Sequence, residues 1–225
     1  MRSFLFLAFA LFSLSIISAS IGCQQRGTES FDGGTIRETW EEPGFSRGPV
    51  LQFEGVVYGD DSGHPLRGFL RDELKASGRR MLDLDAGTGV LGILADLNDA
   101  TEVIATASDR TSLRCIRYNA AQQRVSENHH AVLAEQNPWD LPAQIQPFDL
   151  IVADLAMTEP DRLAAIFDGL ADHLQPSGRA VFAVGPRREL SFWEELATAN
   201  GLQTRWAIDQ ETEFQRERLL EVRRR

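Results

Sequence analysis

From Val50 onward, the hydrophobic residues switch repeatedly between the period of a strand and the period of a helix. Short apolar runs between turn residues indicate strands, and apolar residues three or four positions apart indicate helices. Strands are predicted over 50–58, 80–84, 102–107, 131–134, 148–153, 179–184, 202–208 and 214–222. Helices are predicted over 65–76, 90–97, 111–123, 160–173 and 188–200. Strands that alternate with helices indicate an α/β fold with a largely parallel sheet, which binds ligands beyond the carboxyl ends of its strands.

The residues before this pattern divide into two segments. Residues 24–49 are polar and show neither period, which predicts a flexible tether ahead of a single domain over 50–225. Residues 1–23 have Arg2, then an uncharged and mostly apolar run, then Cys23, which is the pattern of a secretory signal.

The end of this apolar run, Ala19-Ser-Ile-Gly-Cys23, resembles a bacterial lipobox, whose cysteine becomes the lipid-bearing first residue. The resemblance implies an exported lipoprotein held at the membrane through Cys23. Two alternatives stay open at this point. The run is long enough for an uncleaved membrane helix, and a mis-assigned start would leave a cytoplasmic protein.

Composition and charge limit the classes of partner. A chain of 225 residues, 43% hydrophobic, can bury one substantial core. Its net charge of −10 repels phosphate backbones, so we expect no nucleic-acid partner. The two cysteines, Cys23 and Cys115, form no disulfide framework, and neither the cysteines nor the histidines have the spacing of a metal site.

The most informative motif is a glycine-rich turn between a predicted strand and a predicted helix. Gly87-Thr-Gly89-Val-Leu-Gly92 satisfies the G-x-G-x-x-G pattern, which several nucleotide-type cofactors share. Asp83 and Asp85 lie directly before it. Acids at this point suit a cationic ligand better than the pyrophosphate of NAD, so an NAD-linked oxidoreductase is the less favoured interpretation.

An acid followed by this turn resembles the cofactor loop of class I methyltransferases, which use S-adenosylmethionine (SAM). Further resemblances follow in the order of that family at Ser108–Ala121, at Phe148–Asp154 and at Leu174–Phe182. The nearest similarity is to the enzymes that methylate a large-subunit ribosomal protein. The resemblance covers nearly all of 50–225 and implies a Rossmann-like, doubly wound, mostly parallel seven-stranded sheet.

The same resemblance implies a role for each candidate site residue. Asp154 stands where the family contacts the methyl acceptor, so it is the candidate catalytic residue. The candidate cofactor-binding residues are Asp83, Asp85, Gly87 and Gly89 for the amino-acid part of SAM, Asp109 for the ribose and Glu135 for the adenine.

Three positions depart from the family pattern. Asp85 replaces the first loop glycine, where its charge either repels the SAM carboxylate or pairs with the SAM amine. Ala107 stands where the family has the acid that binds the ribose hydroxyls, so Asp109 is either a substitute or only a helix cap. Asp154 replaces an asparagine that orients an amine. Glu135 is either an adenine contact or a solvated turn residue.

These observations favour a SAM-dependent methyltransferase that acts on a nitrogen of a protein or a small molecule. The altered motifs and the predicted export leave a second function open, which is a catalytically inactive lipoprotein that keeps the fold for binding or scaffolding. The two differ in whether the chain binds SAM. The sequence does not identify the acceptor.

Overall fold

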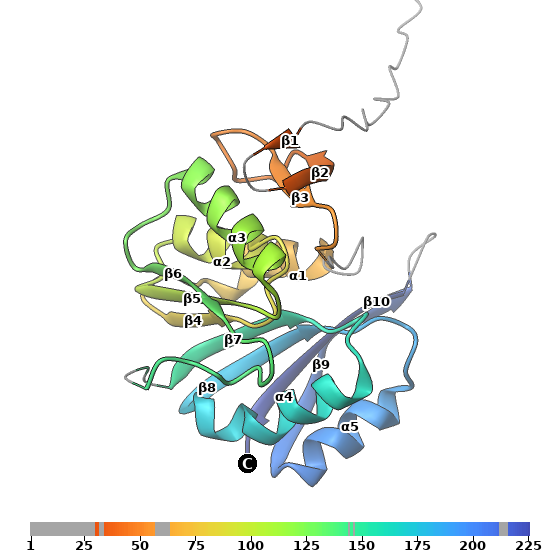
Figure 1. Cartoon of the computed structure of the whole chain (residues 1–225). Helices are drawn as coiled ribbons and strands as arrows, with labels where there is room; N and C mark the ends of the chain where they lie inside the picture. The colour runs from red at the N-terminus through yellow and green to blue at the C-terminus, as the bar shows by residue number, and fades with distance from the viewer. Residues whose placement is uncertain (1–29, 32–33, 57–63, 144, 146, 212–215) are drawn as a thin grey trace, which may run out of the picture.

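The computed structural model describes residues 30–31, 34–56, 64–143, 145, 147–211 and 216–225 (Figure 1). Its main element is a seven-stranded sheet with the strand order β6-β5-β4-β7-β8-β10-β9. The pairs from β6 to β8 are parallel, whereas β10 pairs antiparallel with both β8 and β9. The strands are β4 (Arg80–Asp83), β5 (Glu102–Ala107), β6 (His129–Leu133), β7 (Phe148–Asp154), β8 (Leu174–Ala183), β9 (Leu202–Glu211) and β10 (Arg216–Arg224).

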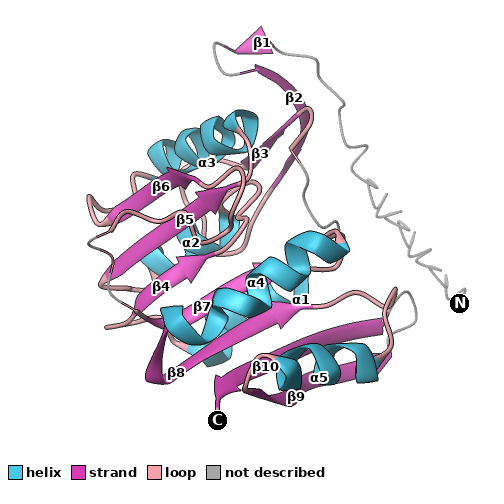
Figure 2. Ribbon diagram, turned by 60° about the horizontal axis from the view of Figure 1, so that its bottom comes forward, coloured by secondary structure: helices cyan, strands magenta, loops and turns pink. Residues whose placement is uncertain are grey.

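Helices cover both faces of this sheet, as Figure 2 shows. They are α1 (His64–Phe69), α2 (Val90–Leu97), α3 (Arg110–Gln123), α4 (Pro160–His173) and α5 (Leu190–Ala199). The predicted doubly wound, mostly parallel α/β sheet is therefore confirmed. Each predicted helix is present, and the bounds of α2 and α4 agree with the prediction at both ends.

The core has two layers because alternate residues of each strand face opposite sides of the sheet. On β7, Leu150 and Val152 pack with α1 and α2, whereas Ile151 and Ala153 pack with α4 and α5. All four side chains are fully buried. A strand that is buried on both faces is a continuous apolar run, which explains why β7 was predictable from the sequence.

The segment predicted to be a tether contains regular structure. Strand β2 (Gly34–Trp40) pairs antiparallel with β3 (Val50–Phe53) and with β1 (Ser30–Phe31) in a small second sheet. The prediction of an irregular segment over 24–49 is wrong at β1 and β2, whereas β3 falls within the strand predicted over 50–58. The cause is that β2 buries one side chain deeply, Ile36, so most of the strand remains polar and lacks a clear apolar period.

Two elements differ from the prediction in their limits. The predicted helix over 65–76 is α1 followed by a π-helical stretch, Leu70–Leu74. Strand β8 begins at Leu174, before the Pro-Ser-Gly sequence that was expected to precede it. Its pairing with β7 shifts register across this sequence, and a Cβ atom at Gly178 would lie 2.8 Å from the carbonyl oxygen of Phe148. Glycine therefore lets the strand continue through the irregularity.

The connection between β6 and β7 contains no helix among its described residues. Its apolar side chains instead pack against the core layer under α4. The Trp139 ring stacks on His173 with centroids 4.3 Å apart, and its Nε1–H donates to the Ala165 carbonyl at 2.9 Å. This connection leaves the carboxyl ends of β4 and β6 close to the start of α4.

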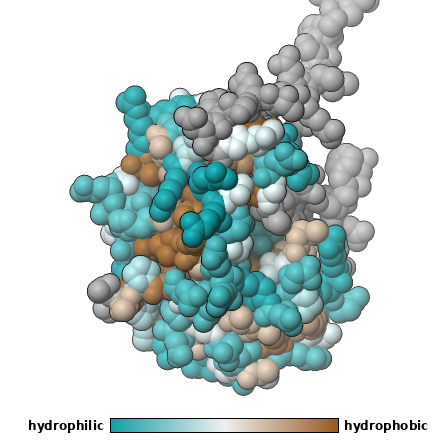
Figure 3. Space-filling view, viewed as in Figure 1, coloured by the Kyte–Doolittle hydropathy of each residue, from teal (hydrophilic) through white to brown (hydrophobic). Residues whose placement is uncertain are grey.

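Hydrophilic residues dominate the face shown in Figure 3, and hydrophobic residues show between them in several smaller areas, the broadest of them left of the centre. Leu97 and Met157 are the large hydrophobic side chains that are exposed among the described residues. No helix in the described part of the chain has the length and apolar character needed to cross a membrane. The predicted signal and Cys23 lie outside the described residues.

Candidate cofactor-binding site

The glycine-rich turn joins the carboxyl end of β4 to the start of α2. Gly89 has φ of +80°, and a Cβ atom there would lie 3.0 Å from the Ile116 side chain of α3. A side chain at this position would therefore be both strained and too close to α3. Asn119 of α3 also holds the turn, because its amide donates to the Thr88 carbonyl at 2.9 Å.

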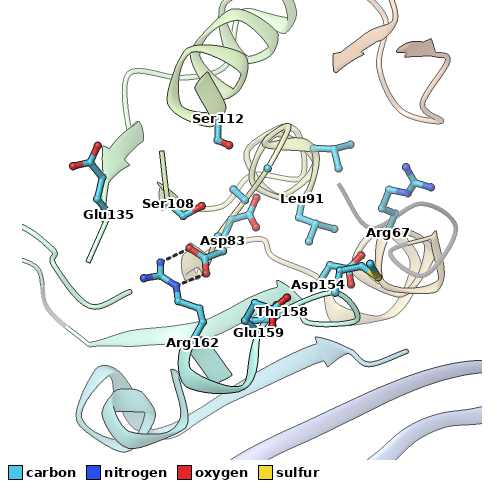
Figure 4. A pocket seen from close by; sticks show the side chains of 15 residues that line it. Arg67, Asp83, Leu91, Ser108, Ser112, Glu135, Asp154, Thr158, Glu159 and Arg162 are labelled. Carbon is cyan, nitrogen blue, oxygen red and sulfur yellow. Dashed lines mark hydrogen bonds and ion pairs between the residues drawn. The ribbon is translucent and has the colours of Figure 1, made fainter. Parts of the chain in front are cut away.

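A pocket of about 290 Å³ lies beside this turn, at the carboxyl ends of β4, β6 and β7 (Figure 4). This is the edge of a parallel α/β sheet at which ligands bind. The lining residues are Arg67, Asp83, Asp85, Ala86, Gly87, Val90, Leu91, Ser108, Ser112, Glu135, Asp154, Met157, Thr158, Glu159 and Arg162. The structure thus brings together Asp83, Asp85, Gly87, Glu135 and Asp154 from the predicted set.

Asp83 lies at the base of the pocket and is fully buried. Its Oδ2 accepts a hydrogen bond of 2.8 Å from the backbone N–H of Gly92, whereas its Oδ1 has no partner. Burial raises the pKa of Asp83 to about 7, with a smaller increase from nearby Asp85 and a decrease from the Gly92 hydrogen bond. A buried acceptor without a partner costs free energy, so a ligand that donates to Oδ1 would gain from this arrangement.

Asp85 stands at the position of the first glycine and has φ of +52°, a conformation that favours glycine. Its carboxylate forms a two-pronged ion pair with Arg162 in the first turn of α4, in which Nε donates to Oδ2 at 2.8 Å and Nη2 donates to Oδ1. Figure 4 shows Arg162, with the dashed lines of this ion pair, at one side of the pocket. The two side chains are only 16% and 17% exposed.

Arg162 also ties the pair to the end of β6. Its Nη2 donates to the Ala134 carbonyl at 3.1 Å, and the backbone N–H of Asp85 donates to Thr106 Oγ1 at 2.9 Å. The charge introduced at Asp85 is therefore balanced within the chain itself. The sequence analysis missed Arg162, and the only signal was indirect, since a carboxylate in a cofactor turn requires a partner.

Asp109 and Gly89 are the predicted site residues that are absent from the pocket lining. Asp109 is the N-cap of α3, and its Oδ1 accepts from the backbone N–H groups of Thr111 and Ser112 at 2.7 and 2.8 Å. Its Oδ2 accepts from the hydroxyl of Ser112. These bonds give Asp109 the capping role that the sequence analysis left open, while its contact with a ribose stays a prediction.

Asp154 ends β7 on the other side of the pocket from Glu135 (Figure 4). Its Oδ1 accepts from the backbone N–H of Ala156 at 3.0 Å, which fixes the side chain at the start of the following turn. Met157, in the same turn, lines the pocket and is 46% exposed. The pocket therefore opens to solvent beside Asp154.

Arg67 of α1 forms another wall that the sequence analysis missed. It is nearly buried, pairs with Glu42 at 3.3 Å, and lies over the ring of Trp40 at 5.9 Å from the ring centroid. Both partners belong to the segment that was predicted to be a tether. That segment thus supports the pocket by positioning Arg67.

The pocket contains more acidic than basic groups. Its acidic side chains are Asp83, Asp85, Glu135, Asp154 and Glu159, and its basic ones are Arg67 and Arg162. Such a lining favours cationic ligands over phosphates. Within the described part of the chain, no cluster of three or more His, Cys, Asp or Glu side chains could hold a metal ion.

A glycine turn after the first parallel strand, an acidic pocket at the strand ends and a sheet that finishes with an antiparallel pair define the class I methyltransferase fold. The family model "Ribosomal protein L11 methyltransferase (PrmA)" matches residues 69–183. The chain belongs to this family.

Curated relatives and solved structures agree with this assignment. The ribosomal protein L11 methyltransferase of Ralstonia pickettii is 29% identical over 169 residues, which cover 71% of this chain and 52% of the relative. That of Azotobacter vinelandii is 28% identical over 152 residues, which cover 64% of this chain and 49% of the relative. The chain thus spans about half the length of these relatives.

Two solved structures share the fold. The ribosomal protein L11 methylase of Lactobacillus delbrueckii has a TM-score of 0.59 at 20% identity, covering 78% of this chain and 86% of its own. The magnesium protoporphyrin IX methyltransferase of Synechocystis, solved with bound SAM, has a TM-score of 0.56 at 16% identity, covering 76% of this chain and 87% of its own. SAM, the predicted cofactor, is thus a ligand that this fold holds in a solved neighbour.

Proposed function

We propose that this chain is a SAM-dependent methyltransferase that transfers a methyl group to a nitrogen atom. The observation that supports this most strongly is the unpartnered Oδ1 of Asp83, which is fully buried and lines an acidic pocket beside a glycine turn. SAM combines a sulfonium and a protonated amine, and such a ligand matches this acceptor and the excess of carboxylates. Membership of the family supports the same cofactor.

For the acceptor, we propose an amine of a protein. The curated relatives are named for the methylation of ribosomal protein L11, and the rim beside Asp154 is open to solvent through Met157. An open rim admits a side chain that is attached to a large partner. A small-molecule amine is the alternative, and a comparison of the two as substrates separates them.

When bound, SAM would supply a methyl carbon that is activated by its sulfonium. The residues of the chain hold the reactants in place, which is the main source of rate in such a displacement. Asp83 and the turn at Gly87 would bind the amino-acid part. The carboxylate of Asp154 would accept a hydrogen bond from the acceptor amine and orient its lone pair. It would also take up the proton that the nitrogen loses when the C–N bond forms, while the C–S bond to the methyl group breaks and S-adenosylhomocysteine leaves.

Titration calorimetry of the full chain with SAM tests the proposal. We expect a dissociation constant of about 1–100 μM, which lies within the range usual for the KM values of enzymes. The absence of heat at millimolar SAM would contradict the proposal and favour the inactive binding or scaffolding role. Transfer of a labelled methyl group from SAM to a lysine-containing peptide, and its loss in Asp154→Ala, would test the acceptor step.

We also propose, on the sequence alone, that residues 1–23 direct export and that Cys23 carries a lipid. The support is the positive start, the apolar run and the lipobox-like end. The intact mass of the mature protein, together with cell fractionation, decides between cleavage with lipidation, an uncleaved anchor and a cytoplasmic chain. The result also decides whether the protein shares a compartment with SAM.

A further inference from the structure

The ion pair between Asp85 and Arg162 has most of its spare hydrogen-bonding capacity on the carboxylate, because the guanidinium already uses four of its five N–H groups. The Nε and both Nη atoms of the guanidinium donate hydrogen bonds to the Asp85 carboxylate and to the backbone carbonyls of Ala134 and Gln136. A carboxylate has about four lone-pair sites, and the fork of Arg162 occupies about two of them. Asp85 can therefore accept further hydrogen bonds on its pocket side, so the pair suits a ligand that donates.

The charge of the pair limits the kind of donor. Asp85 and Arg162 together are neutral, so a ligand ammonium that approaches Asp85 is also repelled by the adjacent guanidinium. A ligand carboxylate that approaches Arg162 is repelled by the adjacent carboxylate of Asp85. A neutral hydroxyl group gains a charge-assisted hydrogen bond without either cost. The buried and unpaired Oδ1 of Asp83 is, by contrast, the acceptor suited to an ammonium.

The position of the pair is also distinctive. In the parallel pairing of β4 with β5, Asp83 lies opposite Ala105, and the backbone N–H of Ala86 donates to the Thr106 carbonyl at 2.8 Å. Asp85 therefore lies beside Thr106, which directly precedes Ala107, and the fully buried methyl group of Ala107 offers no hydrogen bond. The available carboxylate at the ends of these two strands comes from β4 rather than β5.

The pair faces the side of the pocket away from the acceptor opening. In Figure 4, Arg162 and Glu135 lie on one side and Asp154 and Arg67 on the other. Among the neutral donors of SAM, two adjacent ribose hydroxyls match the two oxygens of a single carboxylate. The adenine amino group is the other neutral donor, and it presents only one nitrogen.

We propose that Asp85 binds the ribose hydroxyls of the cofactor and that Arg162 is the positioning residue that holds its carboxylate in place. This assignment rests on the proposed use of SAM. It gives the unusual aspartate of the glycine turn a binding role, where the sequence suggested only a contact with the amino-acid part of SAM or a repulsion. The carboxylate that contacts the ribose thus follows β4, at Asp85, instead of standing at the end of β5, where this chain has Ala107.

The test compares two ligands, S-adenosylhomocysteine and its 2′-deoxyribose analogue, by titration calorimetry. We expect the wild-type chain to bind the ribose form about tenfold or more tightly, since one charge-assisted hydrogen bond is lost in the analogue. Asp85→Gly suits the left-handed backbone at this position, so it removes the carboxylate without straining the turn. In this variant we expect the preference to fall close to onefold.

Three further variants make the test specific. Asp85→Gly/Ala107→Asp returns a carboxylate to the neighbouring strand end, and we expect it to restore the ribose preference. Asp85→Asn keeps one acceptor oxygen for Arg162, so it replaces Asp85→Gly in the ligand comparison if the glycine variant is unstable. Arg162→Lys keeps the charge but not the fork, so we expect a reduced preference, whereas a merely structural role would weaken both ligands equally.

The outcomes separate the two proposals. If the wild-type chain binds neither ligand nor SAM at millimolar concentration, the proposed function fails. If it binds both ligands equally, or if Asp85→Gly keeps the wild-type preference, the ribose assignment alone is wrong. A preference that moves instead with the adenine amino group, measured with S-inosylhomocysteine, would also overturn the ribose assignment.

Discussion

Asp83 and Asp85 lie two residues apart in the same turn, yet they meet opposite surroundings. Asp83 is fully buried, has one backbone donor and no ion pair, and its pKa is raised to about 7 chiefly by burial. Asp85 faces the pocket and is held by the guanidinium of Arg162. One carboxylate therefore changes its charge near neutral pH, and the other belongs to a neutral pair. The difference divides the pocket into an end for a cation and an end for neutral donors.

The largest expected effect is on the pH dependence of stability when Asp83 is replaced by asparagine, which does not titrate. The pKa of Asp83 is higher in the folded than in the unfolded chain, so its contribution to stability is complete below about pH 4 and is lost as the pH rises to about 7. The loss amounts to about 4 kcal/mol. We therefore expect the stability of Asp83→Asn relative to wild type to increase by up to this amount between pH 4 and pH 8.

Urea denaturation of both proteins across this pH range measures the difference. His129 also titrates in this range, since burial lowers its pKa to about 4, but it is present in both proteins and cancels. A constant difference between Asp83→Asn and wild type would contradict the account of Asp83.

The next effect comes from breaking the ion pair on the Asp85 side. Arg162→Met leaves a largely buried carboxylate without its partner, and we expect a loss of about 2–4 kcal/mol in the free energy of unfolding. Asp85→Gly/Arg162→Met removes both charges and should recover at least half of that loss. A double variant as unstable as the single one would show that Arg162 acts through other contacts.

A smaller effect follows from disturbing the turn that contains both carboxylates. Gly89→Ala places a methyl group about 3.0 Å from Ile116 in a left-handed conformation, and we expect a loss of roughly 1–3 kcal/mol. Gly201→Ala is the matched control, because Gly201 is also left-handed but has no atom within 4 Å of the added Cβ. Thermal unfolding should rank Gly89→Ala as the less stable of the two.

The smallest effect is on the affinity for SAM. Because ionised Asp83 suits a cation, we expect the affinity to rise about tenfold from pH 6 to pH 7.5 in wild type. Asp83→Asn should lose this dependence. The variant keeps the other charged groups of the pocket, among them Arg67, Glu135 and Asp154, so the comparison isolates Asp83. The ligand amine titrates equally in both measurements. Parallel pH profiles for the two proteins would show that Asp83 is not the group responsible.

The sheet and most helices were predictable because each buries an apolar face of regular period. The strand β2 was not predictable, since only Ile36 along it is deeply buried. The pocket was predictable from the glycine turn and from the acids that follow the strands. Arg162 and Arg67 were not, because their roles depend on contacts 77 residues apart in one case and on the unpredicted small sheet in the other.

The central claim is that Asp85 and Arg162 bind the ribose while Asp83 faces the amino-acid part of the cofactor. A crystal structure of the full chain with S-adenosylhomocysteine tests it most directly. We predict both ribose hydroxyls within about 2.5–3.0 Å of the Asp85 carboxylate, with the Arg162 fork intact and the ligand ammonium on the side of Asp83. A ribose held elsewhere, or a ligand that breaks the ion pair to place its own carboxylate on Arg162, would contradict the claim.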